Sequence, residues 1–166
     1  MIKLETVLVA TDFSEPSDTA MEYGRTLART FGATLHVIHV VENVFLRTAA
    51  GEFGVSEVGV VMQSLEDAAR RQMDTFVADD DRRELKAQTA ILNANSAALG
   101  IVSYAKEHGA DVIVIGTHGR GALSKLLMGS VAERVVRTAP CPVLTVHHPE
   151  REFLVPDALQ TVKPAS

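Results

Sequence analysis

Short apolar runs rich in β-branched residues alternate along this chain with longer stretches of helical periodicity. The clearest runs are continuously apolar, as expected for strands buried on both faces of a parallel sheet. Strands separated by helices are joined by crossover connections, which place helices on both faces of such a sheet. We therefore predict an α/β fold, a three-layer doubly wound sandwich with a five-stranded parallel sheet and about four helices. The predicted strands cover residues 7–10, 34–41, 85–92, 111–115 and 142–146.

The predicted helices carry apolar residues three or four positions apart and have recognisable ends. Ser14 is a candidate N-cap of the first helix, Pro16 lies in its first turn, and Gly32 closes it. Asn95 or Ser96 is expected to cap the third helix. The first three apolar stripes comprise Ala20, Gly24, Leu27, Ala28 and Phe31; Met62, Leu65, Ala69, Met73 and Phe76; and Ala98, Ile101, Val102 and Ala105. A fourth helix is predicted over residues 131–136.

Three other stretches are assigned from their composition. Residues 43–59, rich in Gly, Ala and Val, are interpreted as a long mobile loop. The acidic run Asp79-Asp80-Asp81, followed by two arginines, is interpreted as a solvated helix end. The segment after His147 contains three prolines and no clear periodicity. We predict one domain over residues 1–147, followed by a C-terminal extension over residues 148–166.

Charge and cysteine content limit the classes of partner. The formal net charge of −5 offers no global positive field for nucleic acid or an anionic membrane. The apolar runs are far shorter than the ~20 residues of a membrane span, and residues 1–5 lead directly into the first strand, leaving no room for a signal peptide. The single cysteine, Cys141, excludes an internal disulfide framework and suits a reducing compartment. A cytoplasmic location is therefore expected.

A glycine-rich loop follows the fourth predicted strand. It reads Gly116-Thr117-His118-Gly119 and is followed nine residues later by Gly129-Ser130 and the last predicted helix. A strand, a glycine loop and a helix N-terminus together form a common phosphate-binding arrangement. Gly116, Gly119 and Gly129 would let backbone amides approach an anion closely, and the Ser130 hydroxyl could donate to a phosphate oxygen.

Other interpretations of the same loop stay open. Ser130 and Glu133 also have the spacing of a capping box, in which the hydroxyl serves only the helix. Arg120 and Lys125 could neutralise phosphate charge or be merely solvated. No Gly-Lys-Ser or Gly-Lys-Thr follows the strand, so the loop is not a Walker motif, and its glycines are too widely spaced for a dinucleotide fingerprint.

Two further positions lie at the ends of predicted strands. Asp12 follows the first strand, where its carboxylate could accept hydrogen bonds from ribose hydroxyls or instead form an Asx turn into the first helix. Val41, at the end of the second strand, could offer backbone groups and apolar contact to an adenine ring, or belong to the core. If the first and fourth strands are neighbours where the strand order reverses, Asp12 and Gly116 face one crevice.

The remaining reactive side chains form no convincing catalytic or metal-binding set. His36 and His39 lack the two-residue spacing that places side chains on one face of a strand, and the adjacent His147 and His148 would point to different sides. Cys141 lies between two prolines with no obvious base to activate it. We therefore predict no catalytic residue and no metal ligand from the protein.

The residues quoted above give the chain a resemblance to the universal stress protein family, extending from Thr6 to Val146. The resemblance rests on Val9-Ala10-Thr11-Asp12 with Ser14 and Pro16, on residues 111–120, on Gly129-Ser130-Val131-Ala132-Glu133, and on Ala139-Pro140-Cys141-Pro142-Val143-Leu144. It implies strand order 3-2-1-4-5 and ATP held by Asp12, Val41, Gly116, Gly119, Gly129 and Ser130, with Arg120 and Val131 completing the predicted binding set. It also implies a homodimer that pairs through Val143 to Val146, and a divalent ion, Mg²⁺ or Mn²⁺, with the triphosphate.

Two departures from the family pattern stand out. Members often have Gly and Pro where this chain has Asn95 and Ala97, although Asn tolerates the left-handed conformation. The 43–59 segment and the tail after His147 are peculiar to this chain, and either could cover the pocket or bind a partner.

Three functions are compatible with these residues. The leading hypothesis is an ATP-binding regulatory protein of a stress response that acts as a nucleotide-responsive homodimer with at most slow hydrolysis. The second is an ATPase or nucleotidyl-transfer enzyme that uses the same crevice, and the absent Walker lysine argues against it. The third is an interaction protein without nucleotide, in which the glycines only shape a tight turn.

Overall fold

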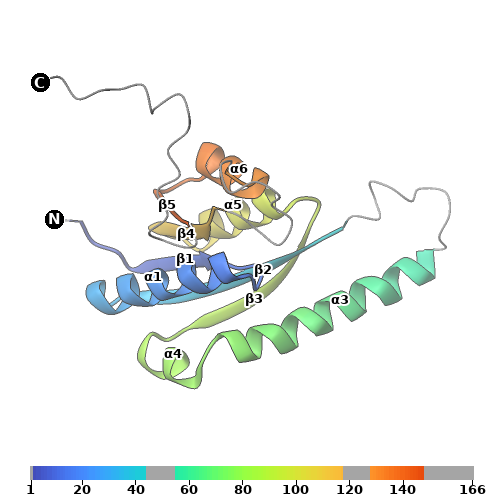
Figure 1. The fold of residues 1–166 in the computed structure, drawn as a ribbon, viewed down its shortest axis with the longest axis horizontal. Helices are drawn as coiled ribbons and strands as arrows, with labels where there is room; N and C mark the ends of the chain where they lie inside the picture. The colour runs from blue at the N-terminus through green and yellow to red at the C-terminus, as the bar shows by residue number, and fades with distance from the viewer. Residues whose placement is uncertain (1, 44–54, 118–127, 148–166) are drawn as a thin grey trace, which may run out of the picture.

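A parallel sheet of five strands organises the protein. The computed structural model describes residues 2–43, 55–117 and 128–147. The strands are β1 (Thr6–Ala10), β2 (Thr34–Glu42), β3 (Gln88–Ala94), β4 (Val112–Gly116) and β5 (Val143–Val146). They lie in the order β3-β2-β1-β4-β5, and every neighbouring pair is parallel. The predicted fold class and strand order are confirmed (Figure 1).

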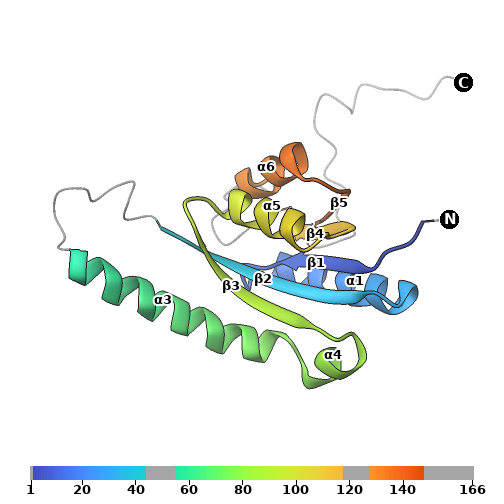
Figure 2. The same cartoon turned by 180° about the vertical axis from the view of Figure 1, so that it is seen from behind.

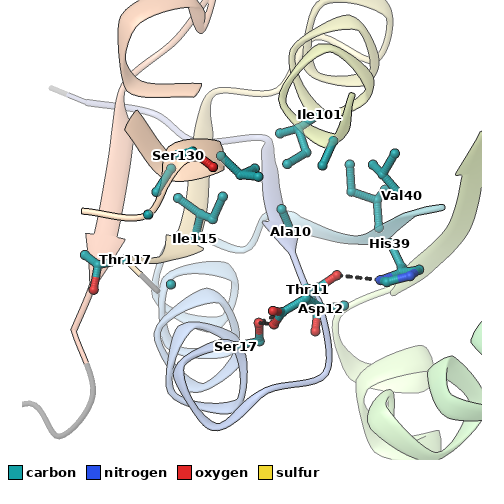
Figure 3. A pocket seen from close by; sticks show the side chains of 16 residues that line it. Ala10, Thr11, Asp12, Ser17, His39, Val40, Ile101, Ile115, Thr117 and Ser130 are labelled. Atoms are coloured by element: carbon teal, nitrogen blue, oxygen red, sulfur yellow. Dashed lines mark hydrogen bonds between the residues drawn. The ribbon is translucent and has the colours of Figure 1, made fainter. Parts of the chain in front are cut away.

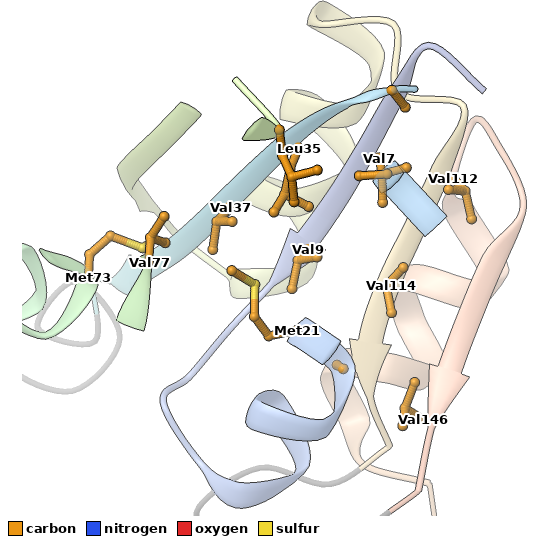
Figure 4. Packing of buried hydrophobic residues seen from close by; sticks show 14 residues of the cluster. Val7, Val9, Met21, Leu35, Val37, Met73, Val77, Val112, Val114 and Val146 are labelled. Carbon is orange, nitrogen blue, oxygen red and sulfur yellow. The ribbon is translucent and has the colours of Figure 1, made fainter. Parts of the chain in front are cut away.

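Helices cover both faces of this sheet, as Figures 1 and 2 show from opposite sides. They are α1 (Glu15–Phe31), α3 (Val55–Phe76), α4 (Asp79–Glu84), α5 (Ala97–Glu107) and α6 (Ser130–Thr138). Side chains alternate along each strand, so Val7 and Val9 pack in a cluster with α1 and α3, whereas Leu8 and Ala10 pack against α5 and α6. Figure 4 shows the first of these two clusters. The sheet is therefore buried on both sides, which explains its continuously apolar strands.

Several predicted helix ends are found where expected. Gly32 adopts a left-handed conformation with φ of 66° at the end of α1. At the start of α5, the Ser96 hydroxyl oxygen accepts a hydrogen bond from the Leu99 amide at 3.2 Å, which identifies Ser96 rather than Asn95 as the cap. Ser14 occupies the N-cap position of α1, but its side chain makes no capping hydrogen bond.

Two predicted boundaries and one predicted environment are wrong. Residues 55–59 belong to α3 instead of the long loop predicted over residues 43–59, of which residues 44–54 lie outside the described residues. The third strand begins at Gln88, because Leu85 is the C-cap of α4. The acidic run is a short helix, α4, and Asp81 in it is only 2% exposed, so it is not a wholly solvated helix end.

Candidate functional site

The first and fourth strands end side by side, at the point where the strand order reverses. Ala10 of β1 is paired with Ile115 of β4, so the segments that follow both strands leave the same edge of the sheet. Parallel α/β sheets commonly bind ligands at such a switch point. Here the edge borders a cavity of about 390 Å³ (Figure 3), within the range of about 300–1,000 Å³ typical of small-molecule sites. Its lining comprises Ala10, Thr11, Asp12, Ser17, Ile38, His39, Val40, Ala97, Ile101, Ile115, Gly116, Thr117, Gly129, Ser130, Val131 and Ala132.

Asp12 stands at the polar side of the cavity and organises the turn into α1. Its Oδ1 accepts hydrogen bonds from the Ser14 amide at 3.1 Å and from the hydroxyls of Ser14 and Ser17 at 2.5 and 2.6 Å. The hydrogen bond from the Ser14 amide to Asp12 Oδ1 is the one expected in the Asx turn that the sequence analysis considered. The same carboxylate lies in the cavity lining. The turn therefore places a carboxylate at the cavity, and the structural role of Asp12 does not remove it from the site.

His39 is a cavity residue that the sequence analysis did not select. Its Nδ1 lies 2.8 Å from the Thr11 carbonyl oxygen, to which it donates a hydrogen bond. The Phe13 ring stacks on the imidazole with centroids 4.7 Å apart, and Phe13 has an unusual positive φ of 61°. A large residue in this conformation is strained and must be held by its surroundings. The position of His39 near the carboxyl end of β2 was the only available sequence signal.

The N-terminus of α6 forms the opposite side of the cavity. The Gly129 amide donates to the Thr117 carbonyl at 2.6 Å, and the first helical hydrogen bond runs from the Glu133 amide to the Gly129 carbonyl at 2.9 Å. The amides of Ser130, Val131 and Ala132 thus precede the first helical bond, and all three residues line the cavity. Such amides, with the helix dipole, favour a bound anion.

Ser130 is the first residue of α6, and its N-cap is Gly129. The capping-box interpretation of Ser130 and Glu133 is therefore wrong, because a capping box requires its hydroxyl at the N-cap position. The Ser130 side chain is exposed and lies in the cavity lining. Ser130 therefore does not cap the helix, and a hydrogen bond from its hydroxyl to a ligand stays a prediction.

The glycines have different physical roles. A Cβ on Gly116 would approach the Pro16 side chain to 2.9 Å and its backbone to 3.1 Å, so this glycine allows the first turn of α1 to lie against the end of β4. Gly129 has an ordinary φ of −61°, which other residues also adopt. Gly119 and Arg120 lie outside the described residues, as do His118 and Lys125.

The Val41 side chain does not line the cavity, so its predicted apolar contact is not found, whereas the predicted backbone contact with an adenine ring stays a prediction. Val41 is 7% exposed and absent from the lining, whereas its neighbour Val40 is present. Because side chains alternate along a strand, a shift of one residue moves a side chain to the other face of the sheet. Val40 and Ile101 form an apolar wall on one side of the cavity, with Asp12 and Ser130 at other sides of it (Figure 3), and Ile38 also belongs to the lining. This arrangement suits a ligand with a flat apolar part and an anionic end.

The part of the chain that the structure describes holds neither a candidate metal centre nor a helix suited to a membrane. No three His, Cys, Asp or Glu side chains in residues 2–43, 55–117 and 128–147 are grouped so that they could hold a metal ion. Among the same residues, none of the helices combines the length and the apolar character needed to cross a bilayer. Cys141 is outside the cavity lining, and burial raises the pKa of its thiol.

Comparisons with known proteins give a consistent family assignment. A family model described as the universal stress protein family matches residues 3–147. A universal stress protein of Thermus aquaticus is 34% identical over 148 residues, which cover 86% of this chain and 98% of that protein. Universal stress protein MJ0531 of Methanocaldococcus jannaschii is 30% identical over 146 residues, covering 88% and 84% of the two chains.

Solved structures of similar proteins share the fold. The hypothetical protein MJ0577 superimposes with a TM-score of 0.74 at 23% identity, covering 89% of this chain and 98% of that one. A universal stress protein in complex with cAMP has a TM-score of 0.55 at 23% identity over 88% and 98% of the chains. One from Archaeoglobus fulgidus in complex with dAMP has a TM-score of 0.51 at 21% identity over 87% and 98%.

Proposed function

The chain belongs to the universal stress protein family, and from that premise we propose that it is an ATP-binding regulatory protein of a stress response. The observation that carries this proposal is the cavity itself, which joins an apolar wall to three helix N-terminal amides and a carboxylate. Nucleotides present the matching chemistry, because they combine an apolar base, ribose hydroxyls and anionic phosphates. The family complexes with cAMP and dAMP support this ligand class.

In the proposed complex, the base lies against Val40 and Ile101 and the ribose hydroxyls face Asp12. The phosphates lie at the N-terminus of α6, where the Ser130 hydroxyl and the amides of residues 130–132 can donate to them. Gly119 and Arg120 would add contacts to the distal phosphates. An accompanying Mg²⁺ or Mn²⁺ would be held mainly by phosphate oxygens, as is usual for magnesium at nucleotide sites. The side chains present therefore fit the proposed ligand.

Regulation by this ligand requires different affinities for two states of the protein rather than fast chemistry. The missing Walker lysine supports at most slow hydrolysis. We place the two states in a homodimer that pairs through Val143–Val146, because β5 is an edge strand of the sheet formed by the described residues, and edge strands can pair with another chain. Thr117 connects this strand to the cavity, since its amide donates to the Val146 carbonyl and its carbonyl accepts from Gly129. A cytoplasmic location completes the proposal and suits the single thiol of Cys141.

Nucleotide binding can be tested by thermal unfolding of nucleotide-depleted protein with ATP, AMP and GTP. At a ligand concentration about 100-fold above its dissociation constant, the free energy of unfolding should rise by about 2.7 kcal/mol. Mass spectrometry of small molecules released on denaturation would identify any ligand that copurifies. A depleted protein whose unfolding temperature does not change with any adenine nucleotide would contradict the proposal.

The position of the phosphates is tested by Ser130→Ala. Loss of one hydrogen bond to a charged oxygen costs roughly 1.5–3 kcal/mol, so the dissociation constant for ATP should rise on the order of 10- to 100-fold. Thr138→Ala is the matched control, because Thr138 is in the last turn of the same helix and its hydroxyl donates to the Arg134 carbonyl. Equal affinities of the two variants, measured by calorimetry, would exclude a phosphate contact by Ser130.

A further inference from the structure

The N-terminal half of α3 projects beyond the sheet. The C-terminal half of this helix packs against the core through Ala69 and Met73, which are 5% and 2% exposed. Near the middle of the helix, Asn93 Nδ2 donates a hydrogen bond to Glu66 Oε1 at 2.6 Å, next to the end of β3. Figures 1 and 2 both show the preceding turns extending past the ends of β1 and β4 and past the first turn of α1. These turns receive no cover from the described parts of the sheet.

A row of apolar side chains runs along this projecting half. Val58, Val61, Leu65 and Ala68, here called the outer stripe, are spaced by three, four and three residues and so share one side of the helix. Val61 and Leu65 are 40% and 43% exposed. Ala69 and Met73, which follow Leu65 at spacings of four residues, are buried in the single chain. The apolar side of the helix is therefore covered along its C-terminal half and exposed at Val61 and Leu65.

The charges of α3 lie on either side of this stretch. Residues 58–65 contain no charged side chain; Glu57 precedes them, and residues 66–76 contain Glu66, Asp67, Arg70, Arg71 and Asp74. An exposed helical surface is normally polar or charged on its solvent side. Two turns that expose valine and leucine, with charged residues only before and after them, resemble the core and rim of a protein interface rather than a solvated surface.

We propose that the outer stripe pairs with the outer stripe of a second copy of this chain, as two antiparallel helices related by a two-fold axis. Apolar residues at spacings of three and four are the pattern by which helices pack together. A two-fold axis brings the same uncharged patch against itself, so two molecules of net charge −5 meet where neither carries charge. An anionic lipid surface would instead select a helix whose polar face is rich in Lys and Arg, and α3 carries only Arg70 and Arg71.

The size of the patch sets the expected strength. A stable interface usually buries about 800 Å² on each partner, and two turns of helix supply less than that. The pairing should therefore be weak by itself, with a dissociation constant in the micromolar range or above. It would add to any pairing of β5, which lies at the far end of the strand order.

Disulfide trapping tests the geometry directly. In a Cys141→Ser background, Val61→Cys places a thiol in the outer stripe, and Val60→Cys places one on another side of the helix, where the side chain is 71% exposed. Mild oxidation should link Val61→Cys into a covalent dimer at several times the yield of Val60→Cys, because a disulfide needs Cα atoms less than about 7 Å apart. Equal yields, or a linked dimer only from Val60→Cys, would overturn the proposal.

Sedimentation equilibrium measures the energetic contribution. Leu65→Glu should weaken this pairing and raise its dissociation constant at least ten-fold. Val60→Glu should leave the dissociation constant within about two-fold of the wild-type value. Circular dichroism and thermal unfolding establish that both variants fold. If wild type and Leu65→Glu show the same average molar mass in solution at every concentration, the proposal is wrong, and the outer stripe does not pair with a second copy of the chain. Nucleotide affinity is measured in parallel. The yield of disulfide-linked dimer and the dissociation constant of the pairing do not depend on nucleotide binding, so failure of the proposed function and failure of this proposal can be distinguished.

Discussion

Two helical glycines have opposite surroundings at the residue scale. A Cβ added to Gly24 in α1 would lie 2.3 Å from Val9 Cγ2, whereas one added to Gly59 in α3 would meet no described atom within 4 Å. Replacement of glycine by alanine favours a helix by up to about 1 kcal/mol, but overpacking a core costs about 1–3 kcal/mol. Gly24→Ala should therefore lower the free energy of unfolding, and Gly59→Ala should raise it. Urea titration of the two variants measures both changes, and a stabilised Gly24→Ala would show that α1 and β1 separate easily.

His36 is a buried histidine at the opposite end of the sheet from the cavity. Its Nδ1 lies 3.1 Å from the Tyr104 hydroxyl, and its ring packs edge-on against His108. Burial, and secondarily the charge of His108, lower the pKa of His36 below its ordinary value of 6.5. The unfolded chain then binds a proton more readily than the folded protein. Stability from this group is complete above pH 6.5 and is lost as the pH falls below that value.

The expected result is a free energy of unfolding that decreases between about pH 6.5 and pH 5.5, with a slope from His36 of at most about 1.4 kcal/mol per pH unit. His36→Gln removes the titrating group and should flatten this part of the profile. Chemical denaturation at intervals of half a pH unit measures both proteins. The assignment fails if the profiles of wild type and His36→Gln run parallel.

At the element scale, α4 is held by a buried ion pair with α1. Arg25 Nε donates to Asp81 Oδ1 at 3.0 Å and its Nη2 donates to Oδ2 at 2.7 Å, while the Ala78 amide donates to Oδ2 at 3.1 Å. The Asp81 side chain is 2% exposed. Removal of Asp81 leaves the Arg25 side chain, which is 17% exposed, with Glu22 as its other carboxylate partner, so the cost should lie at or below the low end of the 3–5 kcal/mol typical of a broken buried pair. The contact therefore fixes a six-residue helix that would be too short to persist alone.

Asp81→Ala should lower the free energy of unfolding by about 3 kcal/mol, because Arg25 loses its main partner. Asp80→Ala is the matched control, since Asp80 is in the same helix and its side chain is 65% exposed. A surface ion pair of this kind contributes at most about 1 kcal/mol. Guanidinium titration distinguishes the two variants, and similar losses for both would mean that the Arg25–Asp81 pair contributes little.

Local patterns predicted most elements but misplaced those that depend on distant partners. The apolar runs of β1 and β4 and the ends at Gly32 and Ser96 were recognised, because their signals lie within a few residues. The run at Asp79–Asp81 was read as solvated, since nothing near it in sequence shows that Arg25, 56 residues away from Asp81, would bury one carboxylate. The early start of α3 was missed because residues 55–59 share the Gly- and Val-rich composition of the segment before them and were interpreted as part of one loop.

At the scale of the whole molecule, the proposed ligand site and the two proposed pairing surfaces occupy separate regions. The cavity lies at the junction of β1 and β4, β5 is one edge of the sheet, and α3 projects beside the opposite half, near β2 and β3 (Figure 1). Two different self-complementary surfaces on one chain generate either a closed tetramer or an extended assembly, depending on the angle between their axes. Thr117 gives the β5 edge a direct hydrogen-bonded link to the cavity, which α3 lacks among the described contacts.

The sequence by itself determined the alternation of strands and helices and most of the signals that begin and end them, because periodicity and capping are properties of neighbouring residues. The strand order came from the family resemblance and was confirmed by the structure. Only the tertiary structure decided that Val40 rather than Val41 faces the cavity, that His39 joins it, and that Ser130 is released from capping. These outcomes depend on which face a side chain takes and on contacts between residues far apart in the chain, and local patterns carry neither.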